Sequence, residues 1–481
     1  MADLLPSVAP PVTPPVTLGV IIGNRDFFPD VLVGEARRDI VKLFGELGIK
    51  AVMVTPEQTK LGGVESFSDS QKCAGLFHEH RDKLDGVLVV LPNFGNESGV
   101  ANVFKLGQFK LPILIQAYPD DLNLLGVERR RDAFCGKISV CNNLHQAGLP
   151  FTLTKKHVVH PIKDPTFKAD LAKFVATCRT VKKLKSARFG AIGARPGAFM
   201  TVRYSEKILE RHGITVHTAD LSEILGKAEK LAGDDKRVQA NIAKTQAYVP
   251  THKVPGDKQI LMAKLAVVLD DFVTDNGLDS TAIQCWTSIQ ENYGCNACTW
   301  MSQMSNALMP SACEVDITGA LSMYALSLAS NVPSALVDWN NNYGGDDDKC
   351  VLFHCGNWPK AFAPDTQVAN APILGSTLGI EKTYGAMEGR TPAGPLTYAR
   401  FTTDDVNGII RGYVGQGTTT DDELNTFGHR AVAHIPKLQQ LMHHVCEHGY
   451  EHHVAVNASH VADVIKEACG KYLGWPIHEH S

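Results

Sequence analysis

Short apolar runs alternate with longer amphipathic segments over the first third of the chain. The runs predict strands at 16–23, 51–55, 86–91 and 112–116, and the segments predict helices at 30–47, 68–84, 98–106 and 132–147. Strands that are apolar at nearly every position are typical of parallel sheets covered on both faces. Because each strand is followed by a helix, the pattern predicts a doubly wound, Rossmann-like α/β domain. The first strand is not followed by G-x-G-x-x-G, which argues against a dinucleotide site.

A second alternating region follows a lysine-rich connection at 180–186. It predicts strands at 189–192, 215–217, 282–286, 334–337 and 351–354, and a helix at 317–330. After residue 358, short runs with Thr, Val and Tyr separated by Gly and Asp predict a β-rich, barrel-like domain with two helices near the end. The predicted division is a proline-rich arm at 1–15, an N-terminal α/β domain at 16–183, a second α/β domain at 184–358 and a β-rich C-terminal domain at 359–481.

Charge and cysteine usage narrow the functional class. The chain of 481 residues has 47 basic and 51 acidic residues and a net charge of −4, which favours neither nucleic acid nor a membrane surface as partner. The N-terminus lacks the pattern of a signal peptide, and no apolar run approaches membrane-spanning length. The twelve cysteines are scattered, as in reduced cytoplasmic proteins. We therefore expect a cytoplasmic protein.

Polar residues recur near the ends of the strands predicted for the second α/β domain. Gln284, Asp338 and His354 lie at strand ends, and Glu314 precedes the helix between them. In open parallel sheets, ligands bind beyond the carboxyl ends of the strands. A carboxylate is costly to bury there unless it binds a cation, forms an ion pair or shares a proton. The alternative is that Glu314 is a helix N-terminal charge and Asp338 a turn residue.

Glu314 and Asp338, with a distant histidine such as His453, would form a three-ligand metal site with open positions. Carboxylates and imidazole suit Mn²⁺, Mg²⁺, Co²⁺ or Zn²⁺. A metal with open positions can polarise a carbonyl while a carboxylate transfers protons, as aldose–ketose interconversion requires. His453 lies in a histidine-rich region, so a surface histidine is the alternative interpretation.

Three motifs resemble the L-fucose isomerase and L-arabinose isomerase superfamily, and most closely its fucose-isomerase-like branch. They are Cys313-Glu-Val-Asp316, Ala335-Leu-Val-Asp338 and His453-Val-Ala-Val-Asn-Ala-Ser-His460. The resemblance implies two α/β domains followed by a β-rich domain. It implies that Glu314, Asp338 and His453 hold Mn²⁺, or another divalent cation such as Mg²⁺ or Co²⁺. It also implies that the two carboxylates are the acid/base pair of a reaction through a cis-enediol. His354 resembles an additional metal-site histidine of arabinose isomerases and is a possible ligand.

The same resemblance suggests substrate-binding residues and an assembly. Gln284, Asn93, Trp339 and Asn457 are candidates for substrate contacts. Arg25 resembles an arginine that reaches the substrate from an adjoining subunit, although a surface cation is the alternative. The resemblance implies a homo-oligomer, a trimer or hexamer, in which active sites are shared. The proline-rich arm could lie across such an interface.

Two questions stay open at this point. Fucose, an arabinose-type pentose and a modified hexose such as a sulfosugar all remain candidate substrates. A non-catalytic cytoplasmic sugar-binding or sensor protein is the competing function, and a dehydrogenase is disfavoured by the missing glycine fingerprint.

Overall fold

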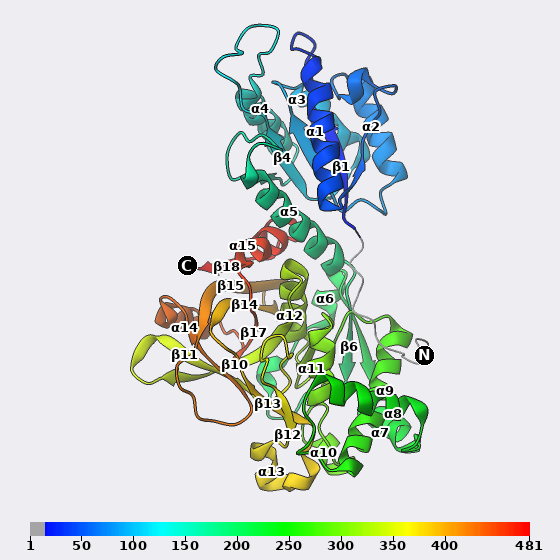
Figure 1. Cartoon of the computed structure of the whole chain (residues 1–481), viewed down its shortest axis with the longest axis vertical. Helices are drawn as coiled ribbons and strands as arrows, with labels where there is room; N and C mark the ends of the chain where they lie inside the picture. Colours follow the sequence, from blue (N-terminus) through cyan, green and yellow to red (C-terminus); the bar gives the residue numbers. More distant parts are fainter. Residues whose placement is uncertain (1–14) are drawn as a thin grey trace. The chain divides into compact units, whose positions relative to one another are not determined.

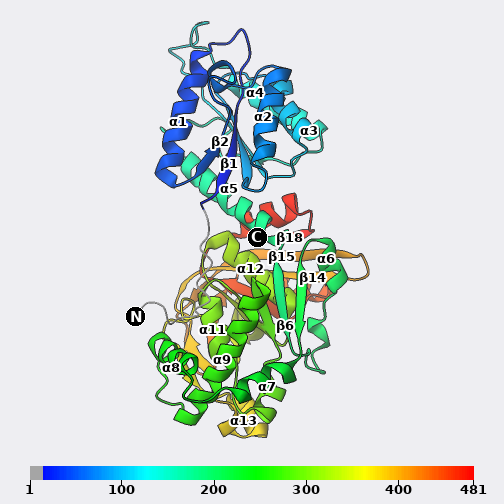
Figure 2. The ribbon, with the colours of Figure 1, turned by 90° about the vertical axis from the view of Figure 1, so that its right-hand side faces the viewer.

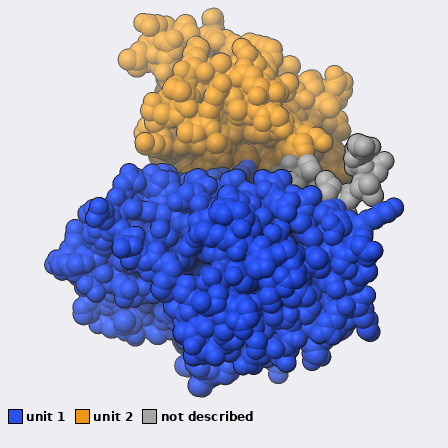
Figure 3. Space-filling model, turned by 60° about the horizontal axis from the view of Figure 1, so that its bottom comes forward, with its two compact units in different colours: residues 1–12, 183–466, 475–481 blue, residues 13–182, 467–474 orange. Residues whose placement is uncertain are grey.

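A computed structural model describes residues 15–481, which form two compact units. Of the described residues, the N-terminal unit contains 15–182 and 467–474, and the larger unit contains 183–466 and 475–481 (Figure 3). Positions 1–14 of the predicted proline-rich arm lie outside the described residues. Among the helices of residues 15–481, none is both long and apolar enough to span a membrane.

The N-terminal unit is built on a five-stranded parallel sheet in the order β2-β1-β3-β4-β5 (Figure 1). Its strands are β1 (Thr17–Ile22), β2 (Lys50–Val52), β3 (Gly86–Leu91), β4 (Ile113–Ala117) and β5 (Thr152–Leu153). Its helices are α1 (Val31–Leu47), α2 (Phe67–Glu79), α3 (Glu97–Gly107), α4 (Ala133–Gln146) and α5 (Pro165–Leu184), with a short η1 (Lys60–Gly62). The predicted doubly wound α/β arrangement is confirmed.

Helices cover both faces of this sheet (Figure 2). On one face, Ile40 of α1 and Phe174 of α5 share a core with Leu88 of β3. On the other, Phe77 of α2 shares a core with Val89, the next residue of β3. Successive strand residues point to opposite faces, so a strand buried on both sides must be apolar throughout.

A segment from far along the chain completes the N-terminal unit. Residues 467–474 include most of the π-helical turn η4 (Lys466–Tyr472). The Tyr472 hydroxyl lies 2.7 Å from the Thr152 hydroxyl and donates to the Ile113 carbonyl at 3.2 Å. The Glu467 carboxylate accepts a hydrogen bond of 2.5 Å from the Thr152 hydroxyl. The short strand β5 is therefore held in place by side chains from a segment near the far end of the sequence.

The larger unit contains a four-stranded parallel sheet in the order β7-β6-β8-β9. Its strands are β6 (Arg188–Ile192), β7 (Thr215–Ala219), β8 (Ser280–Ile283) and β9 (Ser311–Cys313). The helices of this region are η2 (Met200–Val202), α6 (Glu206–Arg211), α7 (Leu221–Lys230), α8 (Lys236–Tyr248), α9 (Gly256–Asn276), α10 (Ser288–Asn292), α11 (Cys298–Asn306) and α12 (Ile317–Ser330). Leu225 of α7, Leu269 of α9 and Trp300 of α11 share one core.

The second sheet of the larger unit is mixed and has nine strands, in the order β12-β13-β16-β11-β10-β17-β14-β15-β18. An additional pairing of β15 with β16 closes the strands between them into a barrel-like ring. The strands are β10 (Ser334–Tyr343), β11 (Asp346–His354), β12 (Gln367–Ala369), β13 (Ala386–Arg390), β14 (Gly394–Asp404), β15 (Ile409–Thr420), β16 (His429–His434), β17 (His453–Asn457) and β18 (Ile477–His480). The helices are α13 (Pro372–Leu378), η3 (Ile380–Lys382), α14 (Leu438–Glu447) and α15 (Ala462–Ile465).

The predicted sheet of two strands is wrong. The runs at 334–337 and 351–354 were expected in the second parallel sheet, but they belong to β10 and β11 of the mixed sheet. These strands pair antiparallel with each other and are joined by the turn at Gly344-Gly345. A connection this short allows only antiparallel pairing. A short apolar run does not reveal which sheet it joins. Strands from both sides of the predicted domain boundary at residue 358 thus share one sheet.

Helix α12 contacts strands of both sheets of the larger unit. Every residue from Ile317 to Ala329 is buried. A helix enclosed on all sides is apolar all round, and its sequence of Ala, Leu, Met and Ser fits that position. Its bounds match the predicted helix at 317–330. The loop before it carries Glu314 and Asp316.

Candidate active site

The larger unit contains a cavity of about 300 Å³ that brings together Glu314, Asp338 and His453. His354 and Cys355 also line it. The rest of the wall is mostly apolar and comes from Phe199, Trp286, Phe353, Ile373, Leu374 and Phe427. Apolar surroundings exclude water and strengthen every electrostatic interaction among the polar groups inside.

Glu314 reaches the cavity from the turn between β9 and α12. Glu314 and Val315 have φ values of 58° and 55°, a left-handed conformation that is unfavourable for both residue types. Such a conformation costs about 1–3 kcal/mol per residue and is often found at functional sites. The Trp286 indole N–H donates to Glu314 Oε1 at 2.9 Å, whereas the buried Oε2 has no hydrogen-bond partner in the described residues. Burial opposes ionisation of Glu314, but the facing His354 and His453 outweigh it and lower the pKa of Glu314.

Asp338 lies within β10 rather than after a strand, contrary to the prediction. It is paired directly with His453 of β17 in the antiparallel register. Directly opposed residues project from the same face of a sheet, so the two side chains meet. Asp338 Oδ1 lies 3.4 Å from Nε2 of His453 and 3.6 Å from Nε2 of His452. Within residues 15–481 this oxygen also lacks a hydrogen-bond partner.

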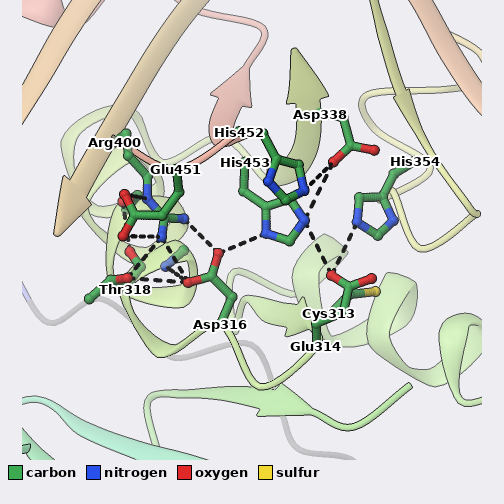
Figure 4. A network of polar contacts seen from close by, with 12 residues as sticks. Cys313, Glu314, Asp316, Thr318, Asp338, His354, Arg400, Glu451, His452 and His453 are labelled. Carbon is green, nitrogen blue, oxygen red and sulfur yellow. Dashed lines mark hydrogen bonds and ion pairs between the residues drawn. The ribbon is translucent and has the colours of Figure 1, made fainter. Parts of the chain in front are cut away.

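His453 is the centre of the group (Figure 4). Its Nε2 lies 3.2 Å from Glu314 Oε2, and its Nδ1 lies 2.9 Å from Asp316 Oδ2. A carboxylate on Nδ1 fixes the proton there in the neutral ring, which leaves the lone pair of Nε2 facing Glu314 and Asp338. Burial lowers the pKa of His453, but Asp316 and Glu314 outweigh burial and raise it above its usual value. In this structure either a proton or a metal cation can therefore satisfy Nε2.

The donor set fits a divalent cation. Two carboxylate oxygens without hydrogen bonds face one imidazole nitrogen, and these are the ligand types of Mn²⁺ and similar ions. Possible ligand atoms of Glu314, His354 and His453 lie within 4.8 Å of one another, as do those of Asp338, His452 and His453. The described residues thus contain a cluster that could hold a metal ion.

Asp316 links this cluster to a buried ion-pair network (Figure 4). Its Oδ1 accepts from the backbone N–H of Gly319 at 2.8 Å and caps α12. Arg400 of β14 donates to both oxygens of Asp316, at 2.6 and 3.0 Å, and lies 3.1 Å from Glu451. Burial opposes ionisation of Asp316, but Arg400 outweighs it and keeps the pKa of Asp316 well below its usual range. Asp316 therefore stays charged and fixes the ring of His453.

His354 is oriented differently from His453. Its Nδ1 accepts a hydrogen bond of 3.0 Å from the backbone N–H of Cys355. In the neutral ring the proton then belongs to Nε2, which lies 3.7 Å from Glu314 Oε2. This geometry favours a role for His354 in orienting Glu314 over its possible role as a ligand of the same cation.

Three other predicted substrate-binding residues do not line the cavity. Trp339 follows Asp338 along the strand, faces the other side and donates to the Tyr413 hydroxyl at 2.9 Å. Asn457 donates to the Ser330 hydroxyl at 2.8 Å, at the end of α12. The Gln284 side chain accepts from the backbone N–H of Ala194 at 2.9 Å. Gln284 thereby holds the loop that leads to Phe199 of the cavity wall.

Arg25 and Asn93 belong to the N-terminal unit, in loops that follow β1 and β3. Arg25 forms an ion pair with Glu97, donates to the Gly95 carbonyl at 3.1 Å and lies over the Phe94 ring at 4.1 Å. Asn93 is buried and donates to the side chain of another buried asparagine in the same unit, at 2.8 Å. Their contact with a substrate stays a prediction.

Sequence reasoning missed several residues of the site. Phe199 and Trp286 line the cavity, and His452 lies beside Asp338. Asp316 lies close to Glu314 in the sequence and Glu451 lies close to His453, so this closeness could have identified both as residues of the site. Arg400 was visible only as a charged residue inside a predicted strand, and such a residue usually needs a buried partner.

The fold and the cavity define a class of protein, an α/β protein in which Glu314, Asp338 and His453 surround a candidate metal site. Two family models match the chain, the fucose/sulfoquinovose isomerase N-terminal domain over residues 19–185 and the L-fucose isomerase C-terminal domain over residues 352–481. The sulfoquinovose isomerases of Priestia aryabhattai and Priestia megaterium are each 25% identical over 459 residues, 91% of this chain and 93% of theirs. That of Alkalicoccus urumqiensis is 24% identical over 302 residues, 62% of this chain and 66% of its own.

The chain belongs to the fucose-isomerase-like branch of the L-fucose isomerase and L-arabinose isomerase superfamily. The predicted function of an isomerase that interconverts an aldose and a ketose is confirmed.

Proposed function

We propose that this isomerase acts on a sulfosugar of the sulfoquinovose type and depends on a metal, with Glu314, Asp338 and His453 as ligands. The observation that carries the metal site is the convergence of two buried carboxylate oxygens without hydrogen bonds on Nε2 of His453. The names of the relatives support the sulfosugar. The free state of all twelve cysteines supports a cytoplasmic location.

The ion that suits this ligand set best is Mn²⁺, with Mg²⁺ and Co²⁺ as alternatives. Three protein ligands leave positions free for substrate, and a bound cation supplies polarisation of the carbonyl group. Asp316 keeps His453 in the tautomer that presents Nε2, and Trp286 holds one oxygen of Glu314. The chain thus fixes the ligands before the substrate binds.

The proton transfer is assigned to Glu314 and Asp338. A carboxylate removes the proton from C2 of the aldose, the substrate passes through a cis-enediol, and a proton returns to C1 of the ketose. Glu314 stays ionised despite its burial, as a base must.

The sulfonate group requires a donor from elsewhere. None of the cavity-lining residues within the described chain is Lys or Arg. A sulfonate is bound best by charge-assisted hydrogen bonds. We assign this role to Arg25 of a second copy, in a trimer or hexamer whose subunits share active sites. Arg25 is half-buried and already held by the Glu97 carboxylate, a carbonyl oxygen and an aromatic ring, so little side-chain entropy is lost when it binds an anion.

The first experiment tests metal dependence. Enzyme stripped with a chelator should lose activity on sulfoquinovose and regain it with Mn²⁺. Glu314→Gln and Asp338→Asn should bind the ion weakly and be inactive. Asp347→Asn is the matched control, because Asp347 is an exposed acid near the start of β11. Full activity of Glu314→Gln after exhaustive chelation would show that the site is wrong.

The second experiment tests the substrate and the proton path. Sulfoquinovose, fucose and arabinose are compared by kcat/KM, and the sulfosugar should be preferred. In heavy water the ketose should carry deuterium at C1, because the transferred proton exchanges with solvent on a carboxylate. Rapid turnover without label would indicate a hydride shift instead.

The third experiment tests the assembly. Light scattering should give a trimer or hexamer. The inactive variants Arg25→Ala and Glu314→Gln should regain part of the activity when they are assembled together, since some sites then receive both intact residues. An active monomer, or no regained activity in verified mixed oligomers, would exclude shared sites.

A further inference from the structure

A group of thiols from separate elements meets beside the cavity. Cys313 ends β9, His354 ends β11 and Cys355 follows it. The sulfur atoms of Cys313 and Cys355 and one ring nitrogen of His354 all lie within 4.8 Å of one another. These side chains are distant in sequence, so the fold brings them together.

His354 faces the thiols with one nitrogen and the catalytic carboxylate with the other. Its Nδ1 lies 3.5 Å from Cys355 Sγ, and its Nε2 lies 3.7 Å from Glu314 Oε2. The lone pair of Nδ1 is thus on the side of the thiols, while the proton on Nε2 points to Glu314. The imidazole can bind an ion through Nδ1 without leaving Glu314.

We propose that Cys313, Cys355 and Nδ1 of His354 form a second metal site, which takes one soft divalent ion such as Zn²⁺ or Cd²⁺. Two sulfurs and one nitrogen leave a fourth tetrahedral position for water, and thiolates select soft ions. Each thiol releases its proton to water as its bond to the metal forms, and the ion takes the place of the Cys355 amide hydrogen at Nδ1. The group made of Glu314, Asp338 and His453 offers oxygen and nitrogen only, and so prefers harder ions.

An ion can reach this site from the substrate side, because Cys355 and His354 line the cavity. Asn357 donates to Cys313 Sγ at 3.2 Å, which would stabilise the thiolate after the proton leaves. The proposal does not depend on the sulfosugar or on Mn²⁺, since Cys313, Cys355 and His354 are not proposed ligands of the catalytic ion.

The test is a titration of the full-length enzyme with Cd²⁺ in the presence of excess Mn²⁺. We expect one equivalent to bind with the intense near-ultraviolet band of cadmium thiolate. Cys355→Ser and Cys313→Ser should each lose most of the band. Cys446→Ser and Cys469→Ser are controls for an exposed and a buried thiol that are not among the proposed ligands, and both should keep it. Glu314→Gln should also keep it, which separates this site from the catalytic one.

A second measurement serves if a cysteine variant does not fold. X-ray absorption of wild-type enzyme loaded with one Cd²⁺ beside Mn²⁺ should show two sulfur atoms in the first shell. A shell of oxygen and nitrogen alone, or a band that both site variants retain, would overturn the proposal.

Discussion

Nδ1 of His453 lies 2.9 Å from Oδ2 of Asp316, and the two side chains are only 1% and 0% exposed. The carboxylate therefore sets the tautomer and the direction of a ring whose other nitrogen faces Glu314 and Asp338. Asp316 does not line the cavity itself, so its influence on the candidate metal site passes through His453.

Asp316→Asn keeps the shape of the side chain and one acceptor oxygen but removes its charge. We expect metal affinity to fall by about 10–100-fold, the usual effect of losing a partner of a metal-binding histidine. Calorimetric titration with Mn²⁺ measures it, with Asp346→Asn as an exposed control and circular dichroism to confirm folding. Unchanged affinity would contradict the orienting role of Asp316.

Arg400→Met removes the buried cation between Asp316 and Glu451. We expect the free energy of unfolding to fall by about 3–5 kcal/mol, because two carboxylates are left buried without a counter-charge. Urea unfolding measures it, and Arg411→Met, at a side chain that is 20% exposed, should lose much less. Adding Glu451→Gln to Arg400→Met should recover part of the loss, and a double variant less stable than the single one would count against this account.

Metal affinity should rise with pH. Burial lowers the pKa of His453, but Asp316 and Glu314 raise it above the usual value of about 6.5. In the metal-free protein this protonation contributes stability below about pH 6.5 that is lost as pH rises through the raised pKa. The cation needs the neutral ring, so its affinity should increase by up to about tenfold per pH unit until that pKa is passed. Calorimetry in two buffers should detect proton release, and His453→Gln should abolish it.

Trp286→Phe removes the hydrogen bond to Glu314 Oε1 and keeps an aromatic ring against Phe199, whose ring centre lies 5.2 Å away. A hydrogen bond to a charged group contributes about 1.5–3 kcal/mol, so we expect kcat to fall roughly tenfold or more. Thermal unfolding should show that the fold is retained. Phe199→Leu is the matched control, because it changes the same wall without touching Glu314. Equal kcat in Trp286→Phe and the wild type would rule out a role for this bond.

Residues with local or repetitive signals were predicted well from the sequence. The helix at 317–330 follows from its composition and from the proline after it, and the strands of the N-terminal unit follow from unbroken apolar runs. The grouping of Glu314, Asp338 and His453 came from family resemblance, because no local rule connects a loop, a strand and a distant histidine.

Other features depend on pairing that the sequence does not encode locally. Asp338 and Trp339 are neighbours in the chain, but the pleat of β10 sends them to opposite faces. The placement of β10 in the mixed sheet decides which of the two reaches the cavity. The left-handed turn at Glu314 and Val315 carries no glycine to reveal it, and the partner of Arg400 emerges only when β14 is packed against α12.

The contact of Tyr472 with Thr152 has a consequence for how the chain is made. A ribosome releases the five strands of the N-terminal unit long before it reaches the segment at 467–474 that holds β5. During that interval the unit has its strands but lacks the hydroxyl and carboxylate that fix its last edge. The edge of the sheet at β5 therefore stays without these contacts until translation is nearly over. Most of the larger unit must be synthesised before the N-terminal unit is complete.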